Sequence, residues 1–177
     1  MKIAICGPSG SGKSTLQNYI CENYRYDIGK TETTREPRES DNGCYEYVSY
    51  KDMLHNISDA KSVFLTEYSG NFYAVPMLEL NKDNAVFVLD YNGIVDIKLS
   101  YGDEVVTVCL DANEDTCKYR MAIRGDSYDS IKNRVTTEPN IDDYTETFID
   151  IHLDAEDSLE YNTMEILKKV FDICIGE

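Results

Sequence analysis

The chain has 177 residues, 42% of them hydrophobic, which is ordinary for a single domain with a sizeable core. Its 17 Lys and Arg residues against 33 Asp and Glu residues give a formal charge of −16. This acidic balance argues against a protein that tracks nucleic acid, because affinity for the phosphate backbone comes from a surplus of Lys and Arg.

The six cysteines form no CxxC pair and no metal-ligand spacing. Several lie within apolar runs, where Cys acts as a small hydrophobic residue, so we interpret them as reduced core residues. No apolar stretch approaches the roughly 18 residues of a membrane span, and no signal-peptide pattern opens the chain. We therefore expect a cytoplasmic protein without a membrane partner.

The first expected element is an apolar run at residues 2–6, followed directly by GPSGSGKST at residues 7–15. This sequence fits GxxxxGK[ST], the loop that joins a buried strand to a helix and binds nucleotide phosphates. Glycines allow positive φ and a close backbone approach, so successive N–H groups can converge on an anion. The helix expected from Lys13 directs its unpaired N–H groups at the same phosphates, and a chance glycine-rich turn would lack this context.

These features predict a site for a nucleoside triphosphate. Lys13 adds a charge near the β and γ phosphates, and Ser14 is the expected Mg²⁺ ligand. The predicted nucleotide-binding set is Gly7, Pro8, Ser9, Gly10, Ser11, Gly12, Lys13, Ser14 and Thr15.

Residues 31–80 interrupt the pattern of alternating strands and helices. The turn-forming residues 41–43 precede alternating Tyr45 and Tyr47, which is typical of a small mixed β region inserted into the core. Arg35 and Arg38 lie three residues apart in this region. They could form a fork for a second phosphate, because planar guanidinium groups bind phosphate oxygens bidentately.

Hydroxyls of Tyr45 or Tyr73 could donate to the remaining oxygens of that phosphate. The alternative is a solvated loop with two surface arginines.

Further apolar runs of strand length lie at residues 85–89, 105–110 and about 148–153, each followed by a segment with helical periodicity. Together with the run at 2–6, this alternation predicts a parallel sheet. The last helix, expected over 158–175, carries one apolar face that would pack on the core.

A third group of cations comprises Arg120, Arg124 and Arg134. Arg120 and Arg124 share a helix face at a spacing of i and i+4, where like charges repel. A bound polyphosphate would relieve this repulsion, as in a mobile lid over a phosphoryl donor. The alternative is ion pairing with Asp126 and Asp129.

The three groups of residues together predict phosphoryl transfer between two anions. A phosphate acceptor is already ionised and needs no strong general base, so cations would carry the catalysis. Nothing marks His55 or His152 as a base, and His152 alternates within FIDIHLD like an ordinary strand residue.

The segments GPSGSGKST, TTREPR, GCYEYVS, SGNFY, VLDYNG and RGDS resemble guanylate kinases in order and approximate spacing, over roughly residues 2–155. The resemblance implies an α/β P-loop NTPase fold, with a five-stranded parallel sheet flanked by helices. It implies one domain with a core, an inserted small mixed β subdomain for the nucleoside monophosphate, and a helical lid. The corresponding ranges are 1–30, 81–119 and 139–177 for the core, 31–80 for the subdomain and 120–138 for the lid.

The resemblance also implies ATP as donor, Mg²⁺ as cofactor and GMP or dGMP as acceptor, in a monomer or homodimer that binds no nucleic acid. By motif, Lys13, Arg120, Arg124 and Arg134 match the catalytic cations. The matching substrate-binding set is Thr31, Arg35, Arg38, Tyr45, Glu67, Tyr73 and Asp90. Asp90 is expected to read guanine, because a carboxylate accepts from N1–H and the 2-amino group.

The chain departs from the family pattern mainly at base recognition. Glu67 is the expected guanine-reading residue, with Thr66 as the alternative, because the segment FLTEYSGNFY is shortened. Val75 stands where the family usually has Ser or Thr, and Val88 where it has the first Asp of a DxD pair. Cys44 stands where an Asp usually precedes the tyrosine.

Two other functions therefore remain open. One is a monophosphate kinase of altered base specificity, acting on another nucleotide or, in the extreme, on a phosphorylated sugar. The other is a catalytically inactive module that binds proteins, which the intact Lys13, Ser14 and lid arginines argue against.

Overall fold

The computed structural model describes residues 1–38, 41, 43–68, 70–137 and 146–176. Its centre is a parallel five-stranded sheet in the order β2-β7-β1-β8-β9. These strands are β1 (Lys2–Cys6), β2 (Asp27–Gly29), β7 (Ala85–Val88), β8 (Val105–Asp111) and β9 (Ile151–Asp154). The predicted parallel sheet is thus confirmed.

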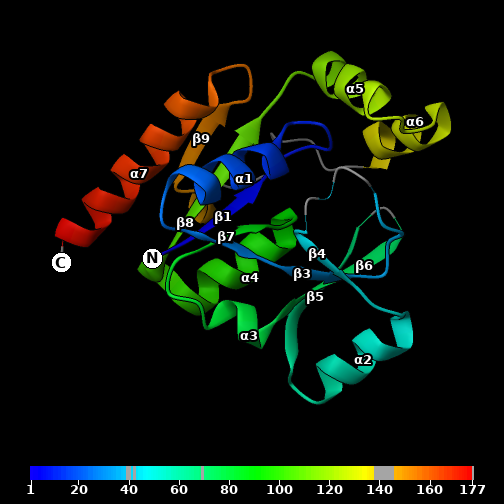
Figure 1. Cartoon of the computed structure of the whole chain (residues 1–177), viewed down its shortest axis with the longest axis horizontal. Helices are drawn as coiled ribbons and strands as arrows, with labels where there is room; N and C mark the ends of the chain where they lie inside the picture. The colour runs from blue at the N-terminus through cyan, green and yellow to red at the C-terminus, as the bar shows by residue number, and fades with distance from the viewer. Residues whose placement is uncertain (39–40, 42, 69, 138–145, 177) are drawn as a thin grey trace.

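Helices cover both faces of this sheet, which is why its central strands are apolar on both sides. On one face, α1 (Lys13–Asn23) and α7 (Leu159–Ile175) bury Leu16, Ile20 and Ile166 against the sheet. On the other, α3 (Met77–Leu80) and α4 (Tyr91–Tyr101) bury Leu80, Ile94 and Ile97. The result is a three-layer core (Figure 1).

A second, mixed sheet lies beside the core in the order β4-β3-β6-β5 (Figure 1). Its strands are β3 (Thr31–Thr33), β4 (Tyr45–Tyr47), β5 (Ser62–Tyr68) and β6 (Asn71–Pro76). Strands β3 and β4 run parallel and the other neighbours antiparallel, and α2 (Tyr50–Ser58) connects β4 to β5. The mixed β region expected within residues 31–80 is therefore present.

The remaining elements lie before and after β8 in the chain. A 3₁₀ turn at Gly102–Glu104 leads into that strand, and a second one at Glu146–Phe148 leads toward β9. Between them, α5 (Glu114–Ile123) and α6 (Tyr128–Thr137) project together from the carboxyl end of the sheet (Figure 1). Among the described residues, no helix has the length and apolar character that crossing a bilayer requires.

The parallel arrangement brings three connections to the same edge of the large sheet. The glycine-rich loop follows β1, Asp90 follows β7, and α5 follows β8. This carboxyl edge is where ligands bind in open α/β sheets. The second sheet and the α5–α6 pair lie on either side of it, so chemistry-bearing residues from four parts of the chain can meet there.

Candidate active site

The loop after β1 takes a conformation that its glycines permit. Gly7, Gly10 and Gly12 have φ values of 140°, 87° and 103°. A Cβ at Gly7 would lie 2.4 Å from the carbonyl oxygen of Leu110, and one at Gly10 would lie 2.6 Å from that of Cys117. Both the torsion and the close approach of neighbouring backbone therefore require glycine at these two positions.

Lys13 stands at the first turn of α1 and folds back over the loop. Its Nζ donates hydrogen bonds to the carbonyl oxygens of Gly7 at 2.8 Å and of Pro8 at 2.7 Å. The helix begins after Gly12 with no side-chain cap and no acidic residue in its first turn. The positive end of the helix dipole and the ammonium group thus face the same space, which favours an anion.

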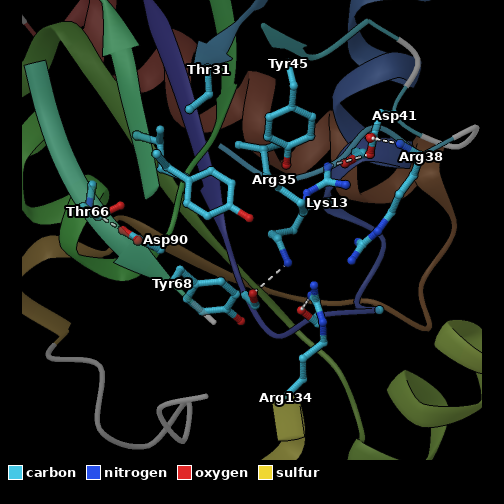
Figure 2. A pocket seen from close by; sticks show the side chains of 18 of the residues that line it. Lys13, Thr31, Arg35, Arg38, Asp41, Tyr45, Thr66, Tyr68, Asp90 and Arg134 are labelled. Carbon is cyan, nitrogen blue, oxygen red and sulfur yellow. Dashed lines mark hydrogen bonds and ion pairs between the residues drawn. The ribbon is translucent and has the colours of Figure 1, made fainter. Parts of the chain in front are cut away.

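A cleft of about 350 Å³ opens beside this loop. It is lined by the loop, by both sheets and by the α5–α6 pair (Figure 2). Of the residues predicted to bind the acceptor or to catalyse, all but Glu67 line it: Lys13, Thr31, Arg35, Arg38, Tyr45, Tyr73, Asp90, Arg120, Arg124 and Arg134. The metal-ligand candidate Ser14 lines it too.

Arg35 and Arg38 are held at the cleft by Asp41, a residue that the sequence reading assigned only to a turn. Asp41 Oδ1 lies 2.9 Å from Arg35 Nη2, and Oδ2 accepts from the backbone N–H of Arg38 at 2.8 Å. The Tyr47 hydroxyl also donates to Asp41 at 2.5 Å. The Arg35 guanidinium lies 4.9 Å from the centre of the Tyr45 ring, so it is fixed on two sides.

The Arg38 guanidinium points into the cleft (Figure 2). Burial lowers the pKa of Arg38, and the charges of Arg35 and Arg134 lower it further. A group of like charges that lowers the pKa of one member identifies a place where an anion would be stabilised. This is the arrangement expected of a phosphate site.

Tyrosine hydroxyls complete this part of the cleft. Tyr45 and Tyr73 are in edge contact at 6.3 Å between ring centres, and Tyr68 contacts Tyr73 at 6.4 Å. Burial, with a smaller contribution from Tyr73, raises the pKa of Tyr45 to about 12. The Tyr45 hydroxyl therefore stays protonated at neutral pH and can donate to a phosphate oxygen.

Two arginines of the α5–α6 pair reach the phosphate loop. Arg134 is buried and donates from Nη1 to Ser9 Oγ at 2.7 Å, while its buried Nε has no hydrogen-bond partner among the described residues. Arg120 donates to the carbonyl oxygens of Ser11 at 3.2 Å and Ala155 at 3.3 Å. Arg124 instead pairs with Asp126, one of the two ion-pair partners considered from the sequence.

The structure places the two guanine-reading candidates, Glu67 and Thr66, on opposite sides of β5. Side chains alternate along β5, so Thr66 is buried on the cleft while Glu67 is exposed on the other side of the strand. A register shift between Val63 and Thr66, with Phe64 at a φ of 56°, determines which side chains at this end of β5 face the cleft. Irregular backbone of this kind cannot be read from residue periodicity.

Asp90 and Thr66 line the end of the cleft that lies away from Arg38, and Val75 lines the cleft as well (Figure 2). Asp90 lines it and also caps α4 by accepting from the Gly93 N–H at 2.8 Å. Val75 is 1% exposed and contributes only methyl groups to the lining. Thr66 and Asp90 are drawn at the same end of the cleft, away from Arg38 (Figure 2).

A second cavity of about 420 Å³ lies on the other side of the phosphate loop, and the sequence did not suggest it. Its lining combines the loop and α1 with the segment that follows β9: Ser11, Gly12, Thr15, Leu16, Leu110, Arg120, Ala155, Glu156, Asp157, Ser158, Leu159 and Asn162. The two groups of residues that line it are distant in sequence, so no local sequence motif could predict this cavity.

The side-chain oxygen atoms near the phosphate loop are of the type that binds Mg²⁺. The Ser14 hydroxyl and the Asp90 carboxylate both line the first cleft, and oxygen ligands shared with phosphates are what this ion prefers.

The guanylate kinase family model matches residues 1–171 of the chain. A guanylate kinase of Clostridium acetobutylicum is 28% identical over 130 residues, covering 70% of this chain and 62% of that protein. One of Lactobacillus delbrueckii subsp. bulgaricus is 30% identical over 144 residues, covering 75% and 70%. The chain thus spans less than two thirds of the length of the clostridial relative.

Solved structures give the same fold. A guanylate kinase from Anaplasma phagocytophilum superposes with a TM-score of 0.72 at 20% identity, covering 95% of this chain and 82% of that one. A gluconokinase from Sinorhizobium meliloti 1021 gives 0.52 at 16% identity, covering 97% and 92%. Since the family match includes the phosphate loop, the arginine and tyrosine cluster and the α5–α6 pair, the chain belongs to the guanylate kinase family.

Proposed function

We propose that this chain transfers the γ-phosphoryl group of ATP to the phosphate of GMP or dGMP, giving ADP and GDP or dGDP. The observation that carries the proposal is the placement of two cavities on either side of one phosphate loop, with cations from separate elements lining the first and Arg120 lining both. Such an arrangement suits a reaction between two phosphorylated substrates, in which positioning and charge neutralisation lower the barrier.

The donor nucleoside would occupy the second cavity, with its triphosphate along the loop. Arg120 lines both cavities, so its guanidinium could contact the triphosphate where it passes from one cavity to the other. Lys13 would exchange its hydrogen bonds to Gly7 and Pro8 for phosphate oxygens. A bound Mg²⁺, held by Ser14, would neutralise part of the charge on the β- and γ-phosphates.

The acceptor phosphate would lie between Arg35, Arg38 and the hydroxyls of Tyr45 and Tyr73. Its oxygen is ionised near neutral pH and can attack without a general base. Among the described lining residues of both cavities there is no histidine, which agrees with this mechanism. Arg134 and Lys13 would stabilise the charge that develops on the phosphoryl group in flight.

A second candidate keeps this reaction and changes the base. Val75 faces the cleft without a polar atom, and Glu67 faces away from it, so guanine would be read by Thr66 and Asp90. Rejection of a wrong base depends on polar groups that are left unpaired, and this cleft offers few of them. The same enzyme could then accept another nucleoside monophosphate.

Formation of ADP tests both candidates. With ATP and Mg²⁺ we expect ADP only when a monophosphate is also present, with GDP appearing in equal amount when that monophosphate is GMP. A panel of GMP, dGMP, AMP, CMP, UMP and dTMP then separates them. A marked preference for GMP or dGMP supports guanine recognition, preference for another base supports the second candidate, and ADP formed equally fast without any monophosphate contradicts both.

A further inference from the structure

Three side chains able to bind a metal converge at the carboxyl ends of β8 and β9, outside both cavities. Cys109 and Asp111 are two residues apart on β8 and so lie on the same side of the sheet. His152 pairs with Cys109 in the register of β8 and β9. One ligand atom from each of the three lies within 4.8 Å of the other two.

The spacing already suits coordination. His152 Nδ1 lies 3.1 Å and 3.3 Å from the two carboxylate oxygens of Asp111. Two ligands held by one tetrahedral Zn²⁺ at about 2.0–2.1 Å lie roughly 3.3 Å apart. An ion inserted between Nδ1 and the carboxylate would therefore require little movement of either side chain.

The three side chains of this cluster differ in their exposure to solvent. Cys109 is fully buried, whereas the side chains of His152 and Asp111 are 39% and 38% exposed. An ion could enter from solvent between the imidazole and the carboxylate and meet the sulfur at the bottom. The net charge of −16 also attracts cations to the molecule.

We propose that Cys109, Asp111 and His152 form a Zn²⁺ site, with water completing the coordination from the open side. Zinc accepts sulfur, nitrogen and oxygen ligands together, whereas Mg²⁺ prefers oxygen alone. The site would tie the edge strand β9 to β8, next to the Leu110 carbonyl that leaves no room for a Cβ at Gly7 of the phosphate loop. Its expected effect is to stabilise this edge of the sheet.

Thermal unfolding with added metal tests the proposal on the whole chain. Zn²⁺ should raise Tm by about 5–10 °C at a hundredfold excess of free metal over its Kd, and Mg²⁺ without nucleotide should not. His152→Gln should weaken Zn²⁺ binding at least about tenfold. His55→Gln is the matched control, because His55 also faces a carboxylate, that of Asp59 at 3.5 Å, but belongs to no group of metal-ligand side chains within the described part of the chain.

Cobalt reports the sulfur ligand directly. With the exposed Cys174 changed to Ser as a common background, Co²⁺ should give visible d–d bands and a sulfur-to-cobalt charge-transfer band. Cys109→Ser should remove the charge-transfer band, and if that buried substitution prevents folding, Asp111→Asn should weaken Co²⁺ binding instead. Equal Zn²⁺ affinity in the parent and in His152→Gln, or a Co²⁺ spectrum without the charge-transfer band, would overturn the site.

Discussion

Lys13 combines two properties that a phosphate-binding residue needs. It stands at the uncapped start of α1, and its ammonium group is held within the loop by the Gly7 and Pro8 carbonyls. Lys13→Ala should lower kcat by about 10²–10³, the usual effect of removing one donor that stabilises transition-state charge. Steady-state kinetics and circular dichroism would check activity and folding. An exposed lysine, Lys51, provides the control substitution, and near-normal turnover of Lys13→Ala would refute the role.

Arg38 differs from Lys13 because it belongs, with Arg35, to the proposed acceptor site. Removing one charge-assisted contact of about 1.5–3 kcal/mol corresponds to roughly a ten- to hundredfold rise in the KM for the monophosphate. We expect Arg38→Ala to show this rise with a smaller change in the KM for ATP, measured by varying each substrate in turn. Arg25→Ala, at an exposed arginine, should match wild type, and unchanged kinetics of Arg38→Ala would remove it from the acceptor site.

Thr66 and Glu67 are adjacent in sequence but face opposite sides of β5. Thr66→Ala should lower kcat/KM for GMP by about tenfold relative to other monophosphates, because one polar contact to the base is lost. Glu67→Gln should leave kcat/KM within about twofold, as expected for an exposed surface residue. A competition assay over the base panel measures both, and the opposite ranking would show that Glu67 turns into the cleft on binding.

At the level of elements, Asp150 connects the segment before β9 to β8 and α4. Its carboxylate accepts from Lys98 Nζ at 2.7 Å and from the backbone N–H and hydroxyl of Thr107, each at 2.8 Å. Burial alone would raise the pKa of Asp150, but the hydrogen bonds from Lys98 and Thr107 outweigh it and hold the pKa below its ordinary value. The charged form is therefore the stabilising one.

Asp150→Asn should lower the free energy of unfolding at pH 7 by about 1–3 kcal/mol. Because the pKa is lower in the folded state, this stabilisation is present above the unfolded pKa of about 3.9 and is lost as pH falls through the folded value. Urea denaturation at several pH values should show wild type and variant converging in acid. Asp83→Asn, at an exposed aspartate, controls for the loss of charge, and a constant difference at all pH values would contradict the linkage.

The elements most accurately predicted were those that a continuous run of residues or a local motif indicates. Four apolar runs predicted four of the five strands of the large sheet, and the glycine motif placed the phosphate loop after the first. The three-residue β2 was missed because so short a segment, Asp-Ile-Gly, carries no periodicity. Which side chains of β5 face the cleft depends on the register shift at Phe64, and only the folded backbone shows this shift.

Features built from distant segments could not be predicted. Asp41 was assigned only to a turn, and its side-chain contacts with Arg35 and Tyr47 appear only in the folded chain. The second cavity joins residues near 11–16 to residues near 155–162. Two of the three proposed zinc ligands were interpreted as a core cysteine and a strand histidine, since Cys109 and His152 meet only through the pairing of β8 with β9.

At the scale of the whole molecule, the parallel sheet delivers the phosphate loop, Asp90 and α5 to one edge, and the mixed sheet faces them across the cleft. Arg134 joins α6 to the loop through its hydrogen bond to Ser9, and cations from three separate parts of the chain line the same cleft. Cations gathered in one cleft suit the stabilisation of charge that develops on a transferred phosphoryl group.

The measurement that tests this account most directly follows the phosphoryl group itself. The chain would be incubated with Mg²⁺, GMP and ATP carrying a label in its γ-phosphate, and the products separated. We predict that the label appears in the β-phosphate of GDP, and that Lys13→Ala slows this transfer. Label that remains in ATP, or that is released as inorganic phosphate while GMP stays unchanged, would contradict the assignment of donor and acceptor sites to the two sides of the loop.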